Sequence, residues 1–123
     1  MSLRHMTNRR ELDALFAALS DSTRRAVLAR LARGSASVTE LAAGPAGAQA
    51  MALPSFLQHL RRLEEGGLIE TAKHGRVRTC ALRTGALAPA RDWLAAQRTL
   101  WEGRHDRPED DLAAPARDDA DGP

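Results

Sequence analysis

The sequence predicts a mainly helical protein with one small β-hairpin, and three observations lead to this fold class. Four segments carry apolar residues at spacings of three and four, which is typical of one face of a helix. A capping sequence indicates a further short helix between the second and third of these segments. Only residues 69–82 have the pattern of two short strands joined by a tight turn. The order α-α-α-α-β-β-α, with a turn after the third helix, predicts a winged helix-turn-helix.

The first two helices are predicted from periodicity and capping. Residues 1–10 are polar and unpatterned, so we expect a flexible N-terminus there. The next residues form one apolar helix face, made of Leu12, Leu15, Phe16 and Leu19. Asp21 is expected to cap a second helix over residues 22–32, which Gly34 ends.

The third and fourth helices have clear start signals. The Ser37 hydroxyl and the Glu40 carboxylate can each accept a hydrogen bond from the other residue's backbone amide, which is a capping box. They predict a short helix over residues 38–43, and a turn containing glycine and proline follows. The fourth helix, residues 53–65, has an apolar stripe made of Leu53, Phe56, Leu57, Leu60 and Leu63.

The remainder of the chain is predicted to be a hairpin, a last helix and a tail. Residues 69–73 and 77–82 are expected to be strands that a turn at His74-Gly75 joins. The last helix is expected from about residue 86 to residue 104. Residues 106–123 are acidic and nearly free of large apolar residues, so we expect them to be disordered.

The charge is divided between a basic body and this acidic tail. Residues 106–123 hold seven acidic and two basic residues, whereas residues 1–105 hold sixteen basic and nine acidic ones. The body favours a polyanionic partner, although an ordinary solvated surface explains such an excess equally well. We expect one domain, at residues 11–105, because 123 residues are enough for a single modest core.

Composition also excludes several classes of protein. No apolar run approaches the roughly 20 residues of a membrane helix, and the N-terminus lacks the apolar stretch of a signal peptide. One cysteine, Cys80, cannot form a disulfide within the chain, which fits a reducing compartment. There is no glycine-rich phosphate loop, HExxH, CxxC or Ser-His-Asp set. We therefore expect a cytoplasmic protein that is not an enzyme and needs no cofactor.

The fourth helix is the candidate recognition helix. With its apolar stripe turned toward the domain, Ser55, Gln58, Arg61 and Arg62 face outward and His59 lies on the flank. A helix fits the major groove of DNA, and these side chains offer the donors and acceptors that base edges require. Ser55, Gln58 and Arg62 are expected to contact bases, and His59 and Arg61 phosphates. A solvated helix face is the alternative reading of this helix alone.

The hairpin strengthens the case for DNA, because Lys73, His74, Arg76 and Arg78 gather in and beside its turn. Arg76 and Arg78 are expected to point to the same side of one strand. A basic hairpin beside a basic helix can straddle a phosphate backbone. The alternative is a charged edge strand that only prevents edge-to-edge pairing.

Four segments, in order, resemble the ArsR family of winged-helix regulators: Leu15 to Leu28, Ser37 to Ala42, Leu53 to Ile69, and Gly75 to Leu82. The resemblance covers about residues 11–105. It implies a homodimer that binds an operator, usually represses, and often releases DNA when an inducer binds. The family commonly has a serine at the position of Leu57 and a Ser or Thr cap at that of Ala52, so the resemblance leaves the operator sequence open.

Metal sensing is the family's best-known trait, and we expect no metal site here. The cysteine pair that one sensor type needs is missing from residues 40–46. For a site on the last helices of two subunits, the chain offers only Asp92, His105 and Glu109. Cys80 has no second thiol, so we expect it to be a small apolar residue.

The last helix predicts a subunit contact. Ala90, Trp93, Leu94, Gln97, Leu100 and Trp101 share one stripe, and a small winged helix has little core left for two indoles. Pairing across a two-fold axis with Leu12, Leu15 and Phe16 of the first helix would bury them. Packing within one subunit is the alternative.

The sequence thus predicts a homodimeric, sequence-specific repressor that binds double-stranded DNA at an inverted repeat. Two recognition helices can then contact half-sites about one helical turn apart. The alternative from another class is a winged-helix module for protein–protein contact, without an operator. Whether the regulator answers to a small-molecule inducer, a partner protein or nothing stays open.

Overall fold

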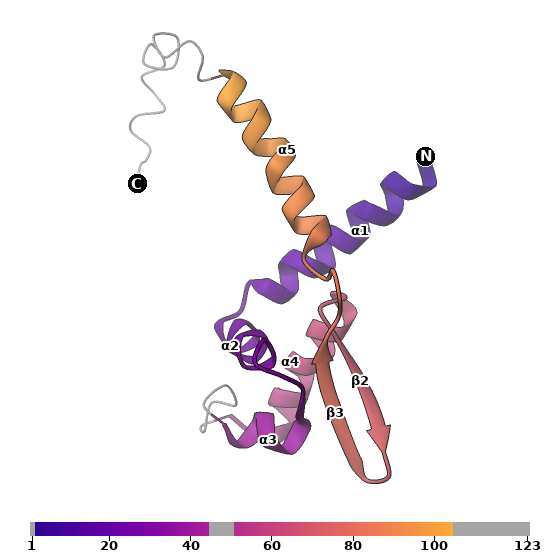
Figure 1. Ribbon diagram of the computed structural model, residues 1–123, viewed down its shortest axis with the longest axis vertical. Helices are drawn as coiled ribbons and strands as arrows, with labels where there is room; N and C mark the ends of the chain where they lie inside the picture. The colour runs from indigo at the N-terminus through magenta and orange to yellow at the C-terminus, as the bar shows by residue number, and fades with distance from the viewer. Residues whose placement is uncertain (1, 45–50, 105–123) are drawn as a thin grey trace. The chain divides into compact units, whose positions relative to one another are not determined.

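The computed structural model describes residues 2–44 and 51–104 and confirms the predicted order of elements (Figure 1). The elements are α1 (Ser2–Leu19), α2 (Ser22–Leu31), β1 (Ala36–Ser37), α3 (Val38–Ala43), α4 (Leu53–Glu65), β2 (Ile69–His74), β3 (Val77–Leu82) and α5 (Ala88–Arg104). The described residues divide into two compact units, one ending at Ala90 and the other beginning at Arg91. The predicted tail, residues 106–123, lies outside the described residues.

The first helix begins earlier than predicted. Residues 1–10 were expected to be flexible, but α1 is helical from Ser2 onward. Residues 2–19 contain neither glycine nor proline, and leucine, arginine, methionine and glutamate among them are good helix formers. Apolar periodicity identifies only the part of a helix that packs on a core. It therefore did not predict the N-terminal turns of α1, which extend the helix beyond its packed part.

Both predicted caps are confirmed. The Asp21 carboxylate accepts a hydrogen bond from the backbone N–H of Arg24 at 3.1 Å. Ser37 and Glu40 exchange bonds of 3.0 and 2.8 Å, so the capping box is complete. The Ser37 backbone N–H, followed by its hydroxyl, holds the pKa of Glu40 below its usual value. These two caps fix where α2 and α3 begin, and so set the chain direction on entry to the helix-turn-helix.

The core of residues 1–90 forms where α1, α2 and α4 pack together and meet the sheet. Its largest buried side chains are Leu15, Val27, Leu41, Phe56, Leu63, Leu68, Ile69 and Cys80. Cys80 is a small apolar core residue, as predicted. Burial raises the pKa of its thiol, and the nearby Glu64 carboxylate adds to this rise. The thiol is therefore held in its neutral, unreactive form.

The sheet has one more strand than predicted. β1 pairs antiparallel with β3, so that Ala36 lies opposite Cys80, and the strand order is β1-β3-β2. A strand of two residues is too short to show an alternation, which is why the sequence pattern missed it. β1 ends directly where α3 begins, so the pairing anchors the helix-turn-helix to the hairpin.

The hairpin turn lies one residue later than predicted. His74 pairs with Val77, which leaves Gly75 and Arg76 as the turn, rather than His74 and Gly75. Gly75 has a φ of 65°, a conformation that glycine adopts without steric cost. Arg76 therefore lies in the turn and not in a strand with Arg78, so the expectation that both share one strand face was wrong.

The close approach of α1 and α4 depends on a residue without a side chain. A Cβ atom on Gly66, at the end of α4, would lie 2.9 Å from the Ala14 carbonyl oxygen and 3.0 Å from the Ala18 Cβ. We expect Gly66→Ala to lower the free energy of unfolding by roughly 1–3 kcal/mol, as overpacking does. Chemical denaturation measures this change. Gly103→Ala is the control, because nothing lies within 4 Å of that site; an equal loss there would contradict the packing argument.

Candidate nucleic-acid interface

The recognition helix α4 has the two faces that the sequence predicted. Phe56, Leu60 and Leu63 are buried in the core, whereas Leu53 and Leu57, which the sequence placed on the same apolar stripe, are exposed. The four residues predicted to face outward are all exposed, namely Ser55, Gln58, Arg61 and Arg62. Ala52 at the N-cap makes no side-chain hydrogen bond, and Pro54 occupies the first turn. The helix is thus held in place by its apolar stripe and not by its cap.

The two exposed arginines of α4 make only weak side-chain contacts within the protein. Arg61 donates from Nη1 to the Gln58 side-chain oxygen at 3.3 Å. Arg62 lies 3.9 Å from a Glu65 oxygen, and both side chains are more than half exposed. An exposed ion pair of this kind is worth about 0–1 kcal/mol. Both guanidinium groups are therefore free to exchange these contacts for an anion.

His59 lies on the flank of α4, and its side chain is 20% exposed. Arg24 donates from Nη1 to the His59 Nδ1 at 2.8 Å, and an Asp21 oxygen lies 3.7 Å from the same nitrogen. Arg24 also donates to the carbonyl oxygens of Ala17 and Ala18 at the end of α1. This cluster joins α1, α2 and α4. The sequence did not predict it, because Arg24 and His59 are 35 positions apart.

The tautomer of His59 follows from this contact. A guanidinium group only donates hydrogen bonds, so Nδ1 must accept here and a neutral ring carries its proton on Nε2. The Asp21 carboxylate is drawn into the same cluster. Although burial acts to raise its pKa, the backbone N–H and the positive charge of Arg24 lower it overall.

We call the hairpin β2–β3, residues 69–82, the wing; it extends from the domain as a two-stranded ribbon (Figure 1). All four cationic or titratable residues predicted for it are exposed, namely Lys73, His74, Arg76 and Arg78. Arg78 is two positions before the buried Cys80, so both lie on the strand face that meets the domain. Arg76 occupies the tip of the wing.

A hollow of about 320 Å³ separates the recognition helix from the wing. It is lined by Val38, Leu57, Leu60, Arg61, Glu64, Thr71 and Arg78. Arg78 donates to the Thr71 hydroxyl at 3.2 Å, and this hydroxyl donates to a Glu64 oxygen at 3.2 Å. These bonds tie the wing to α4. Arg61 and Arg78 thus line opposite walls of one groove, a geometry that suits a phosphate backbone.

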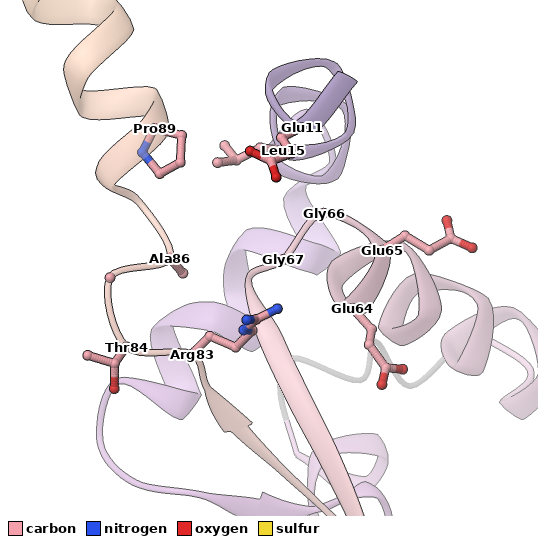
Figure 2. A pocket seen from close by; sticks show the side chains of 11 residues that line it. Glu11, Leu15, Glu64, Glu65, Gly66, Gly67, Arg83, Thr84, Ala86 and Pro89 are labelled. Atoms are coloured by element: carbon pink, nitrogen blue, oxygen red, sulfur yellow. The ribbon is translucent and has the colours of Figure 1, made fainter. Parts of the chain in front are cut away.

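A second hollow, of about 330 Å³, lies where α1, the end of α4 and the segment after β3 meet (Figure 2). Its charged lining residues are Glu11, Glu64, Glu65 and Arg83, with Leu15 and Pro89 as apolar neighbours. This hollow shares Glu64 with the groove between α4 and the wing but contains none of the predicted DNA contacts.

The predicted subunit interface divides into buried and exposed residues. Leu15 and Ala90 lie in the core of residues 1–90, so the expectation that they face a partner was wrong. Leu12, Phe16 and Gln97 are partly buried. On α5 the four large apolar residues of the stripe are exposed, namely Trp93, Leu94, Leu100 and Trp101. The apolar stripe of α5 is thus largely exposed.

Membrane-spanning helices and clusters of metal-binding side chains are both absent from the described residues. Residues 2–44 and 51–104 contain no helix that is long and apolar enough to cross a membrane. The same residues hold no group of three or more His, Cys, Asp or Glu side chains placed to bind a metal ion. Of the weak metal candidates, His105 and Glu109 lie outside the described residues.

Comparisons with known proteins agree with this geometry. A family model described as a helix-turn-helix domain matches residues 19–72, and a search of curated proteins found no match. A crystal structure of an ArsR family transcriptional regulator is 51% identical, covering 75% of this chain and 91% of its own, with a TM-score of 0.68. An ArsR-like regulator from Rhodococcus sp. RHA1 is 32% identical, covering 76% of this chain and 85% of its own, with a TM-score of 0.64.

A third solved structure shares the fold. It is the homodimeric winged helix-turn-helix DNA-binding domain Mb0332 from Mycobacterium bovis, with 24% identity and a TM-score of 0.57. The alignment covers 79% of this chain and 88% of that one. The fold, the exposed recognition helix, the basic wing and the 51% identity lead to one assignment. The chain belongs to the ArsR family of transcriptional regulators, which are DNA-binding winged helix-turn-helix proteins.

Proposed function

We propose that the protein is a sequence-specific repressor that binds an inverted-repeat operator as a homodimer. One observation carries the proposal: Arg61 from the exposed face of α4 and Arg78 from the wing line the same groove. In this arrangement α4 enters the major groove while the wing follows the adjacent phosphate backbone. Binding by the dimer at a promoter then blocks transcription.

The residues fall into three roles. Ser55, Gln58 and Arg62 contact base edges, where Arg pairs with guanine and Gln with adenine. Arg61 and His59 contact phosphates, and the Nε2–H of His59 is the donor because Arg24 occupies Nδ1. Wing contacts to the backbone come from Lys73, His74, Arg76 and Arg78.

The homodimer is proposed from α5. An exposed stripe with two tryptophans and two leucines is larger than scattered surface residues require. A two-fold axis through this stripe would cover it with its own copy. The partly buried Leu12 and Phe16 of α1 complete the proposed contact. The Mb0332 domain, of the same fold, is described as homodimeric.

Arg76 tests the wing contact. Because it lies at the exposed tip of the hairpin, we expect Arg76→Ala to remove one phosphate contact and reduce the slope of log K against log salt by about one. The slope is measured by titrating a labelled duplex at several salt concentrations. An unchanged slope would remove the wing tip from the phosphate footprint.

The DNA-binding part of the proposal is tested by the salt dependence of binding of the full chain to random duplex DNA. A DNA-binding regulator with this many cationic contacts loses affinity steeply as salt rises. The competing function, a winged-helix module for protein contact, predicts no measurable binding to duplex DNA. Absence of binding at low salt would therefore reject the repressor and leave the protein-contact module.

A further inference from the structure

The outward face of the recognition helix is not entirely polar. Leu57 is 38% exposed and Leu53 is 55% exposed, although other leucines of α4 are buried. Residues 53, 57 and 61 are four positions apart, so the two leucines and Arg61 follow one another along the same side of the helix. An apolar strip thus lies directly beside a side chain proposed to bind phosphate.

The position of Leu57 in the groove limits what can cover it. Leu57 lines the hollow between α4 and the wing together with Arg61 and Arg78. Glu64 also lines the groove and balances only one of the two arginines, so an apolar protein segment entering it would remove an uncompensated positive charge from water, which is costly. A polyanion supplies the counter-charge. The charge of this groove therefore favours DNA as its occupant.

DNA presents one apolar group in its major groove, which is the C5 methyl of thymine. The methyl stands at the side of the groove, next to the backbone of its own strand. A side chain that meets it should therefore be apolar, should project from a helix in the groove, and should neighbour a phosphate-binding residue. Leu57 meets all three conditions, because Arg61 follows one helical turn later.

We propose that Leu57 selects thymine at one position of each operator half-site by covering its C5 methyl, and that Leu53 packs beside it. This inference rests on the proposed function, since it requires α4 to lie in the major groove. It adds a specificity determinant that hydrogen bonding from Ser55, Gln58 and Arg62 does not supply. Hydrogen-bonding groups cannot detect a methyl, whereas an apolar contact can.

The test removes the methyl and the leucine separately. The operator is first recovered by selecting duplexes with the full chain from a random-sequence library. Each thymine is then replaced by deoxyuridine, which lacks only the C5 methyl and keeps the base pair. For the unaltered protein, we expect one thymine per half-site at which this replacement weakens binding roughly fourfold, the effect of leaving one methyl in water.

The variant Leu57→Ala should bind the thymine operator more weakly by a similar factor and be indifferent to deoxyuridine at that position. Leu87→Ala is the matched control, because Leu87 is also an exposed leucine but lies outside α4. It should keep the full sensitivity to deoxyuridine. Equal midpoints of thermal unfolding for both variants show that folding is unchanged.

The outcomes separate this inference from the proposed function. If an operator is selected but deoxyuridine has no effect at any position, or its effect persists in Leu57→Ala, the thymine contact is wrong and the repressor stands. If no sequence is enriched over the starting library, sequence-specific binding is wrong and the thymine contact fails with it.

Discussion

Replacing Leu94 and Trp101 together by glutamate is expected to convert the protein to a monomer and to weaken operator binding by about 10²- to 10⁴-fold. Both side chains are more than half exposed on the apolar stripe of α5. Two carboxylates at the centre of a two-fold contact would face their own copies and be desolvated without a counter-charge. A monomer binds only one half-site, so it loses the extra affinity that a dimer gains by binding both half-sites at once.

Sedimentation equilibrium gives the mass of each variant, and titration of the operator gives the affinity. The control is Ala95→Glu with Thr99→Glu, which adds the same charge on the opposite side of α5, where both residues are exposed. This control should remain a dimer with nearly unchanged affinity. A Leu94→Glu, Trp101→Glu variant that stays dimeric would show that the subunit contact lies elsewhere.

Arg62→Ala is expected to weaken binding to the operator by roughly 1–3 kcal/mol, with a much smaller effect on random DNA. Arg62 is exposed on the outward face of α4, and its only ion pair among the described residues is the loose one with Glu65. A bidentate contact from this guanidinium to guanine would be lost with the side chain. Affinities for the two kinds of duplex are compared at the same salt concentration.

Arg98→Ala is the matched control for Arg62→Ala. Arg98 is also an exposed arginine in a surface pair with a glutamate, Glu102, but it belongs to α5. Its loss should change both affinities little. If Arg62→Ala instead lowers the affinities for operator and random DNA equally, Arg62 contacts a phosphate and the base contact is wrongly assigned.

Local signals in the sequence predicted most of the fold. The Asp21 cap and the Ser37–Glu40 capping box involve residues three positions apart, so their sequence alone determines the hydrogen bonds. The stripe of Phe56, Leu60 and Leu63 likewise has the helical period, and it correctly predicted which face of α4 is exposed. Elements with such short-range causes were placed to within about one or two residues.

The features that the sequence did not predict depend on contacts between distant residues or on a strand of only two residues. The pairing of β1 with β3 joins residues more than forty positions apart through a two-residue strand. Arg24 and His59, and the Arg78–Thr71–Glu64 chain, meet only after α2, α4 and the wing have packed. Leu15 was assigned to a subunit contact because periodicity identifies an apolar face but does not say what covers it.

The sequence predicted which residues of α4 are exposed on the candidate DNA surface, but it did not predict the groove between α4 and the wing. Exposure of Ser55, Gln58, Arg61 and Arg62 followed from helical spacing. The groove that brings Arg61 opposite Arg78, with Leu57 inside it, depends on the angle between α4 and the wing. That angle is set by tertiary packing, which no local pattern encodes.

That this protein binds DNA as a sequence-specific dimer is the proposal on which the others depend. Its most direct test is selection of bound fragments from sheared genomic DNA of the host, at physiological salt with excess random competitor. We predict recovery of one or a few fragments that share an inverted repeat, with half-sites about one helical turn apart. Recovery of no fragment above the competitor would contradict the claim.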